Sequence, residues 1–176
     1  MSDFITDKGS AAFGTRLRRL SERLDRDVRE LYREHGIEFE PSWYPVVASL
    51  GEIGPTSVGD LASHMRISHA AVSQIRGKLL KASLVSVRED AADHRRQVLR
   101  LTRKGQALVG RLRPLWEAIA HVTEQLNRLH APHLLRELTA LETALDEQSL
   151  IDRVSDKMGR RAKIKTDLKG KSNVVR

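Results

Sequence analysis

The chain has 176 residues, of which 40% are apolar and 4% aromatic, and it carries a net charge of +8. This length is enough for one domain with a buried core. The chain has no cysteine, which excludes disulfides, thiolate metal sites and cysteine nucleophiles. No apolar run approaches the ~20 residues needed to span a bilayer, and residues 1–8 lack the basic and apolar regions of a signal peptide. We therefore expect a cytoplasmic protein with no membrane partner.

The charges are distributed unevenly along the chain. Residues 66–113 carry twelve basic and three acidic side chains, residues 114–152 carry two basic and seven acidic ones, and residues 153–176 carry nine basic and two acidic ones. A basic block inside a folded region is the electrostatic pattern expected of a protein that binds a polyanion. A solvated surface of mixed charge is the alternative interpretation.

The amino-terminal part of the chain has the pattern of two helices. Over residues 13–35 apolar side chains recur every three or four positions, which predicts a long amphipathic helix that ends at Gly36 and packs on a partner. Its apolar stripe consists of Phe13, Leu17, Leu20, Leu24, Val28 and Leu31. Ser42 is expected to cap a second, short helix that ends at Leu50. The chain is then broken at Gly51, Gly54 and Pro55.

Two short helices joined by a tight turn come next. Ser57 and the acidic residue three positions later have the spacing of a capping box, which begins a helix over residues 58–65. Residues 66–67 form the turn, and Ser68 caps the following helix, residues 69–82. The buried side of this second helix is expected to consist of Val72, Ile75 and Leu79.

The hydrophobic period then changes from about 3.6 residues to about 2. Residues 84–88 and 97–101 have the alternation of two short strands, and a polar tip at residues 89–96 separates them. This pattern predicts a β-hairpin with a charged, projecting loop.

Helices complete the chain. Thr102 is expected to cap a helix that runs to about residue 129, with a kink at Pro114. Pro132 is expected to begin a last helix, whose apolar face consists of Leu134, Leu138, Leu141 and Leu145. Residues 153–176 are basic and lack a clear apolar face, so we expect a disordered tail. An additional phosphate-binding arm is the alternative interpretation of this tail.

A helix, a turn, a second helix and a hairpin, in this order, are typical of a winged helix-turn-helix. Gln74 near the start of the second helix can pair with adenine through two hydrogen bonds. Arg76 and Lys78 are suited to phosphates, and Arg95 at the hairpin tip can enter the minor groove, oriented by Asp93. The predicted DNA-binding residues are Ser57, Ser68, His69, Ala70, Ser73, Gln74, Arg76, Lys78, Arg88, Asp93, Arg95 and Arg96.

Several motifs of this region together resemble the MarR family (multiple antibiotic resistance regulators). They are Ser-Val-Gly-Asp-Leu-Ala at 57–62, Ser-x-x-x-Val-Ser at 68–73, Leu-Val at 84–85, Asp-His-Arg-Arg at 93–96 and Leu-Arg-Leu-Thr-Arg-Lys-Gly at 99–105. The resemblance implies a mostly helical (α+β) homodimer that binds a pseudo-palindromic operator in double-stranded DNA and responds to a small, often aromatic, effector. The chain also resembles the regulator part of proteins that fuse this domain to an acetyltransferase, and we expect no such enzyme domain here.

Two residues depart from the pattern of that family. Ser83 stands where the family usually has glycine, and a left-handed conformation there is less favourable for serine. Gly77 stands inside the second helix where an acidic residue is common, and it weakens the helix by about 1 kcal/mol relative to alanine. We expect a somewhat softer recognition helix, with every DNA contact retained.

Aromatic and histidine residues form further candidate sites. Trp43, Tyr44 and Trp116 are candidates for a ligand pocket, and core packing is the alternative. The local histidine clusters are His35 with Glu34 and Glu38, and His130 with His133. Without cysteine these clusters are poor metal sites, so we predict no metal and no cofactor.

No phosphate-binding loop, nucleophile elbow or His-Glu-x-x-His motif occurs in the sequence, which argues against an enzyme. We predict a sequence-specific transcriptional regulator, a ligand-responsive repressor that acts as a homodimer. The alternatives are a non-specific architectural nucleic-acid-binding protein and a winged-helix protein-interaction module. The predicted organisation is an arm (1–12), helices for dimerisation and support (13–50), the winged helix-turn-helix (51–105), dimerisation helices (106–152) and the basic tail (153–176).

Overall fold

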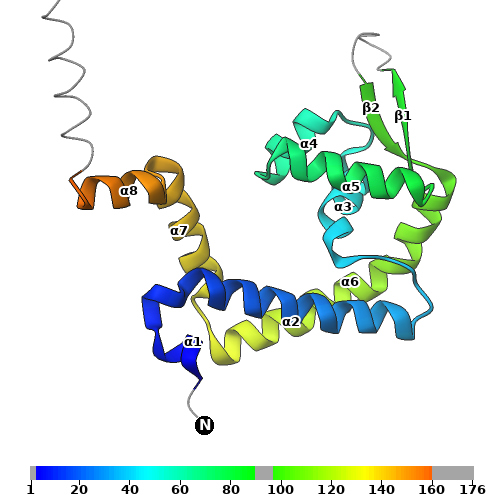
Figure 1. The fold of residues 1–176 in the computed structure, drawn as a ribbon. Helices are drawn as coiled ribbons and strands as arrows, with labels where there is room; N and C mark the ends of the chain where they lie inside the picture. The colour runs from blue at the N-terminus through cyan, green and yellow to red at the C-terminus, as the bar shows by residue number, and fades with distance from the viewer. Residues whose placement is uncertain (1–2, 90–96, 160–176) are drawn as a thin grey trace, which may run out of the picture. The chain divides into compact units, whose positions relative to one another are not determined.

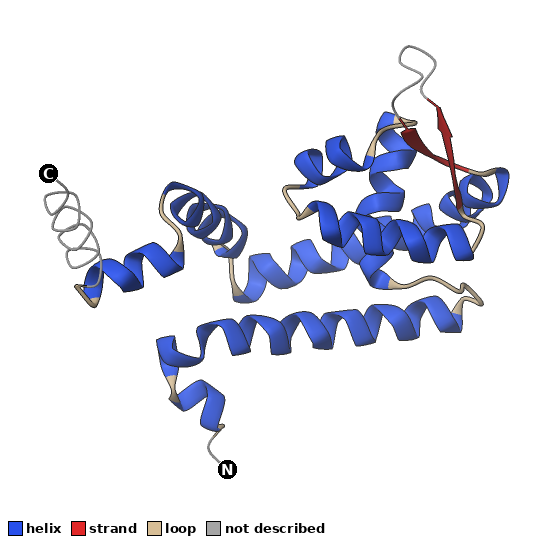
Figure 2. Cartoon of the chain, turned by 45° about the horizontal axis from the view of Figure 1, so that its top comes forward, coloured by secondary structure: helices blue, strands red, loops and turns tan. Residues whose placement is uncertain are grey.

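The computed structural model describes residues 3–89 and 97–159 of the chain. The chain folds into two compact units, Met1–Leu115 and Trp116–Arg176, and the boundary falls inside one long helix. Helices make up most of the described residues, and two strands form the sheet, as the colours of Figure 2 show. No helix in the described ranges is long and apolar enough to cross a membrane.

The first unit combines long and short helices with a hairpin. Its elements are α1 (Phe4–Asp7), η1 (Gly9–Ala12), α2 (Phe13–Glu34), η2 (Pro41–Trp43), α3 (Tyr44–Ile53), α4 (Val58–Met65), α5 (His69–Lys81), β1 (Val85–Glu89), β2 (Gln97–Leu101) and the start of α6 (Arg103–His130). The second unit contains the rest of α6, α7 (Leu134–Glu147) and α8 (Leu150–Lys157). The order of elements is followed by colour in Figure 1. The predicted fold class, mostly helical with a helix-turn-helix and a two-stranded wing, is confirmed.

Helix α2 ends at the predicted glycine and leads into an aromatic cluster. Gly36 has a φ of 62°, and the amide of Ile37 donates to the carbonyl of Tyr32 over 2.9 Å, which satisfies the end of the helix. The turn brings Phe39 against Tyr32, edge to face, with ring centroids 5.4 Å apart. Trp43 packs on Phe39 in the same manner at 5.6 Å. This cluster fastens the connection between α2 and α3 to the core.

The core of the first unit lies beneath α3, α4, α5 and the wing. The fully buried side chains come from each of these elements and from α6, and they include Val46, Val47, Leu61, Val72, Leu79, Leu99 and Leu112. Val72 and Leu79 are buried as predicted, while Ile75 is half-buried. The burial of one face of α5 leaves its other face available.

The predicted caps and turn of the helix-turn-helix are confirmed. The Ser57 hydroxyl accepts a hydrogen bond from the Asp60 amide at 3.1 Å, and the Ser68 hydroxyl accepts one from the Ala71 amide at 3.1 Å. Between the two helices Arg66 adopts the left-handed conformation, with a φ of 54°. Both helices therefore begin and end where local sequence signals predict.

The wing is an antiparallel pair in which Val85 lies opposite Leu101 and Glu89 lies opposite Gln97. Strand β1 begins and ends one residue later than predicted, and β2 has the predicted bounds. A contact that we did not predict lies on the other edge of β2. Thr56 and Leu99 exchange backbone hydrogen bonds of 3.1 and 2.8 Å, so the segment before α4 pairs with the wing.

The junction of α5, the wing and α6 is held by backbone contacts. Ser83 has the left-handed conformation that the comparison with glycine anticipated, with a φ of 58°. The Thr102 hydroxyl donates to the carbonyl of Ser83 at 2.8 Å and accepts from the Gly105 amide at 3.0 Å, so Thr102 caps α6 as predicted. A Cβ at Gly105 would lie 2.1 Å from the carbonyl oxygen of Leu84, which explains why glycine stands there.

The prediction for the start and end of α3 was wrong. Ser42 does not cap it, because Pro41–Trp43 form the short helix η2 and α3 follows with Trp43 as its N-cap. Proline at the first position of η2 favours this early turn, since its φ is fixed near the helical value. Gly51 lies inside α3, and the helix ends only where Gly54 takes a φ of 80°.

Two predictions for the second unit also need correction. Helix α7 begins at Leu134 rather than Pro132, with His133 as its N-cap. A further helix, α8, crosses the predicted start of the disordered tail at residue 153. The Ser149 hydroxyl accepts from the Asp152 amide at 3.2 Å, and this cap begins a helix that the basic composition obscured. Residues 160–176 of the predicted tail lie outside the described residues.

Candidate nucleic-acid interface

The amino-terminal half of α5 presents an exposed, polar surface. Ser68, His69, Ala70 and Gln74 are exposed, and Val72 on the opposite face is fully buried. Figure 1 shows α4, α5 and the hairpin gathered in one part of the first unit. Small and polar side chains at this end of a helix permit close approach to base edges or phosphates.

Two of the predicted DNA-binding residues contact each other. The Ser73 hydroxyl lies 3.5 Å from Nδ1 of His69, one helical turn away, and Ser73 is half-buried. The contact restrains the imidazole on the exposed face of α5. The pair offers both donors and acceptors to a ligand.

The hydroxyls of Ser57 and Ser68 already serve as helix caps. Ser57 Oγ also donates to the Asp60 carboxylate at 2.9 Å. A phosphate that approached Ser57 would meet this carboxylate as well, which is unfavourable electrostatically. Ser68 has no such acidic neighbour in its cap, which consists of its hydroxyl and the amide of Ala71.

The cations expected to contact phosphates lie on two elements. Arg76 is half-buried on α5, Lys78 is exposed on the same helix, and Arg88 is exposed on β1 opposite Val98. Sequence reasoning did not select Arg66, which is exposed in the turn directly before α5. Its place in the basic block was the available signal. These residues place positive charge directly before α5, on its second half and on β1.

The tip of the wing lies outside the described residues, which stop at residue 89 and resume at residue 97. The predicted contacts of Asp93, Arg95 and Arg96 with DNA therefore stay predictions.

Of the three aromatic residues predicted to line a ligand pocket, only Trp43 lines the cavity described next. Trp43 lines a cavity of about 690 Å³, together with Phe39, Leu84, Lys104, Arg111 and other residues between η2 and α6. Tyr44 is 46% exposed and does not line this cavity. Trp116 begins the second unit.

The polar side chains that line this cavity include two cations, an indole and the carboxylates of Glu38 and Glu40. Lys104 Nζ donates to the carbonyl of Ala82 at 2.9 Å, and Arg111 donates to the carbonyl of Gly36 at 3.2 Å. The indole nitrogen of Trp43 is buried and meets no acceptor among the described residues. An aromatic ring suits the indole and the ring of Phe39, and the cations and carboxylates together suit a ligand that has both donor and acceptor groups. Within residues 3–89 and 97–159 no group of three or more His, Asp or Glu side chains is arranged to hold a metal ion.

A comparison with protein-family models gives a match over the region that contains α4, α5 and β1. Residues 35–96 match the model of the MarR family. Its described part includes η2, α3, α4, α5 and β1. The comparison with curated proteins gives no match.

Solved structures with the same fold include DNA-bound proteins. Bordetella bronchiseptica BpsR, described in terms of the regulation of its DNA binding by 6-hydroxynicotinic acid, is 26% identical; the match covers 72% of this chain and 91% of BpsR, with a TM-score of 0.58. The S. aureus MepR–DNA complex is 18% identical, covering 76% of this chain and 97% of MepR, with a TM-score of 0.62. An E. coli MarR mutant complexed with operator DNA is 16% identical, covering 82% and 99%, with a TM-score of 0.60. At the two lower identities the likeness shows the fold alone.

Proposed function

The chain contains a MarR family domain, matched over residues 35–96, and its α4, α5, β1 and β2 form a winged helix; from this premise we propose that the chain is a sequence-specific DNA-binding transcriptional regulator. The observation that carries the proposal is the exposed polar half of α5, set in a block of twelve basic and three acidic side chains. That charge supplies attraction to phosphates, and the polar end of the helix supplies groups that can read bases. The DNA complexes of MepR and E. coli MarR, which have this fold, support the same use of the surface.

The predicted residues divide into two roles in this proposal. Gln74 and His69 read base edges in the major groove, where an amide can hold adenine through two hydrogen bonds. Arg76, Lys78 and Arg88 contact phosphates and fix the register of the helix. The residues assigned to the remaining contacts are Ser57, Ser68, Ala70, Ser73, Asp93, Arg95 and Arg96. The described caps favour Ser68 over Ser57 for a phosphate contact.

We further propose that the regulator is a homodimer. Exposed apolar side chains on α2 include Phe13, Leu17, Leu20 and Leu24, and those on α7 include Leu135, Leu141 and Leu145. Burial of such side chains against a second copy would contribute about 25 cal/mol per Å² of apolar surface. A two-fold pair of α5 helices then reads the half-sites of a pseudo-palindromic operator one helical turn apart. Residues 13–50 and 106–152 serve dimerisation in this proposal, and residues 51–105 serve DNA binding.

The response to an effector belongs to the same proposal. BpsR is described as regulated by 6-hydroxynicotinic acid, a small aromatic acid, and the cavity beside Trp43 presents Lys104 and Arg111. We assign this cavity to a small aromatic effector that releases the protein, acting as a repressor, from its operator. The proposal gives the chain no catalytic role.

The test is a selection of random duplex DNA with the purified protein at about 150 mM salt, because phosphate contacts make affinity salt-dependent. We expect an enriched inverted repeat whose half-sites lie one helical turn apart. Strong binding without an enriched motif would instead favour a non-specific architectural protein. Absence of binding, with and without aromatic acids, would favour a protein-interaction role for the winged helix.

A matched pair of variants tests the reading residue. Gln74→Ala is expected to reduce discrimination at one base position in each half-site by about 1–3 kcal/mol. Gln106→Ala changes the same residue type at an exposed position of α6 and is expected to leave the motif unchanged. An identical motif for both variants would reject the assignment of Gln74.

A further inference from the structure

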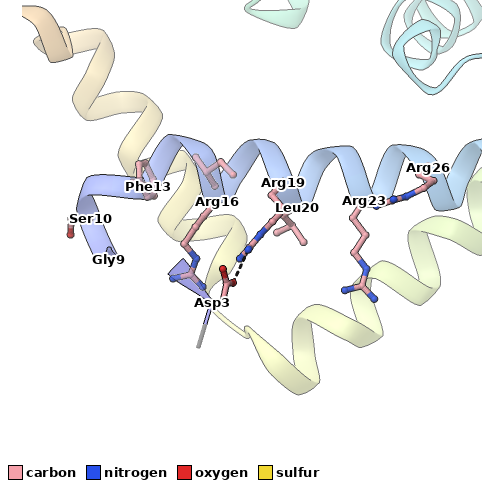
Figure 3. Close-up of a pocket in the computed structure, with 10 residues that line it drawn as sticks. Asp3, Gly9, Ser10, Phe13, Arg16, Arg19, Leu20, Arg23 and Arg26 are labelled. Carbon is pink, nitrogen blue, oxygen red and sulfur yellow. Dashed lines mark hydrogen bonds and ion pairs between the residues drawn. The ribbon is translucent and has the colours of Figure 1, made fainter. Parts of the chain in front are cut away.

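Two hollows of the described residues already belong to proposed surfaces. The groove along the amino-terminal half of α2, with a volume of about 1020 Å³, is lined by Phe13, Leu17 and Leu20 among others and belongs to the face proposed for the homodimer (Figure 3). The cavity beside Trp43 is assigned to an effector. The junction between the end of α5 and the start of α6 borders that cavity, and it lies at the other end of α5 from the residues proposed to read DNA bases.

Helix α5 ends in a tight backbone turn. The amide of Ser83 donates to the carbonyl of Leu80 over 2.9 Å, and the amide of Leu84 donates to the carbonyl of Leu79 over 3.0 Å. These bonds satisfy carbonyls within the last turn, whereas the carbonyls at the very end of a helix point beyond it and take donors from elsewhere. The carbonyls of Ala82, Ser83 and Leu84 are in this position.

The first turn of α6 supplies a donor to each of these three carbonyls. Lys104 Nζ donates to the carbonyl of Ala82 over 2.9 Å, and the Thr102 hydroxyl donates to that of Ser83 over 2.8 Å. The Thr102 amide donates to the carbonyl of Leu84 over 3.0 Å. Both strands of the wing lie between donors and acceptors in the sequence, so the contact joins elements that are not neighbours along the chain. We call Thr102 and Lys104 the α6 clamp.

Two further observations show that this junction is tight. The Thr102 hydroxyl also accepts the Gly105 amide at 3.0 Å, so one oxygen caps the start of α6 and holds the end of α5. A Cβ on Gly105 would lie 2.1 Å from the carbonyl oxygen of Leu84, so the backbone of α6 itself lies against the junction. The Lys104 ammonium stands at the carboxyl end of α5, where a positive charge interacts favourably with the helix dipole.

The length of α5 makes its direction important for DNA reading. The helix has 13 residues, with His69 at its first position and Lys81 at its last. It is therefore about 20 Å long, and a rotation of about 5° at one end moves the other end by about 1.7 Å. A displacement of this size is enough to break a hydrogen bond to a base. The angle of α5 thus decides whether His69 and Gln74 reach base edges.

We propose that Thr102 and Lys104 are positioning residues of the DNA-reading surface. They contact no DNA, and they hold α5 at the angle at which its first turns meet the base edges. The inference rests on the proposed function and adds to it two residues of α6, outside the helix-turn-helix and the wing. Because α6 continues into the second unit, the α6 clamp also connects α5 to a helix proposed for dimerisation.

The test compares operator DNA with a scrambled duplex, because positioning and charge affect the two differently. The double variant Thr102→Val/Lys104→Met keeps side chains of similar size and removes both side-chain donors. It is expected to bind the selected operator about tenfold more weakly than the parent chain, with unchanged affinity for the scrambled duplex and an unchanged salt dependence. Loss of a phosphate contact would instead lower both affinities and reduce the salt dependence.

Two controls accompany the double variant. Thr102→Ser/Lys104→Arg keeps a hydroxyl and a cationic donor, and it is expected to bind both duplexes like the parent chain. Arg103→Met removes the exposed cation between the two residues of the α6 clamp, and it is expected to leave the ratio of the two affinities unchanged. Titration at stoichiometric concentration gives the active fraction of each variant, so a loss of folded protein is not counted as a loss of positioning.

A measurement without DNA separates the inference from the proposed function. Residual dipolar couplings of the backbone amides give the direction of α5 relative to α4 and the wing in the free protein. The direction is expected to change in Thr102→Val/Lys104→Met and to match the parent chain in Thr102→Ser/Lys104→Arg.

Three results would overturn the proposal. The first is an unchanged direction of α5 in Thr102→Val/Lys104→Met, whether or not the chain binds DNA. The second is an operator preference that this variant retains in full. The third is a parallel loss of affinity for both duplexes with a weaker salt dependence, which would make Lys104 a phosphate contact. A parent chain that selects no operator would reject the proposed function itself, and with it the DNA-reading role of the α6 clamp.

Discussion

One backbone oxygen decides which residue can stand at position 105. A Cβ on Gly105 would lie 2.1 Å from the carbonyl of Leu84, whereas a Cβ on Gly77 in α5 would have no neighbour within 4 Å. We predict that Gly105→Ala destabilises the fold by about 1–3 kcal/mol or more, because the wing must shift away from α6. Gly77→Ala is expected to stabilise it by about 1 kcal/mol through helix propensity. Urea unfolding measures both, and equal stability of the two variants would contradict the account.

The left-handed residue at the end of α5 leads to a prediction of the opposite kind. Ser83 has a φ of 58°, a conformation that costs most side chains about 1–2 kcal/mol. Glycine avoids this cost, but its greater conformational freedom in the unfolded chain offsets part of the stabilisation. Ser83→Gly is therefore expected to raise the free energy of unfolding by about 0.5–1 kcal/mol. Ser63→Gly inside α4 is the matched control and should lower it. Destabilisation by Ser83→Gly in thermal unfolding would be inconsistent with this account.

The ionisation of Asp3 is measurable at a single carboxyl group. Its pKa is lowered from 3.8 to about 2, chiefly by the Thr6 hydroxyl and then by Arg19. A group whose pKa falls on folding stabilises the folded state above its ordinary pKa, and this contribution is lost as the pH falls through the lowered value. NMR titration of Asp3 should give a midpoint near 2 in the parent chain and a higher one in Thr6→Val and Arg19→Ala. A midpoint unaffected by either substitution would rule out these contacts.

At the scale of elements, local signals predicted helices and strands well where a cap or a period was present. Ser57 and Ser68 mark the starts of α4 and α5 because a hydroxyl satisfies an amide within its own turn. The prediction failed where an element is held by a residue far away in the sequence, or where the charge of a segment hid a helix. Thr56 pairs with β2 across more than forty residues, and its neighbours give no strand period. The cap of α8 at Ser149 was overlooked because α8 crosses residue 153, where the basic segment that was taken as one disordered tail begins.

The candidate site could be predicted only in part. The polar start of α5 follows from sequence spacing, since one helix carries all of its members. Sequence spacing could not show whether Trp43, Tyr44 and Trp116 line one pocket. The position of Trp43 depends on its packing with Phe39, which in turn packs on Tyr32, and Trp116 belongs to the other unit.

At the scale of the whole molecule, the proposed homodimer predicts the behaviour of the second unit. Leu141 and Leu145 on α7 are 45% and 46% exposed in the single chain and lie on one face. Replacing both with lysine is expected to shift the particle from dimer to monomer in sedimentation, because buried charges without partners are unfavourable. The control is Glu142→Lys, a charge change at an exposed neighbouring position, which keeps the dimer. A monomeric parent chain would refute the dimer itself.

The pairing of Thr56 with Leu99 has a consequence for how such a molecule can change its fit to DNA. Strand β2 is tied on one edge to β1 and on the other to the segment that leads into α4. Swinging the base of the wing away from the helix-turn-helix would break both hydrogen bonds of this bridge. The two parts therefore move as one rigid reading head. In the proposed homodimer, the distance between the two DNA-binding domains can then change while each domain keeps its shape. Slow exchange of the Thr56 and Leu99 amide hydrogens would show that the bridge is rigid.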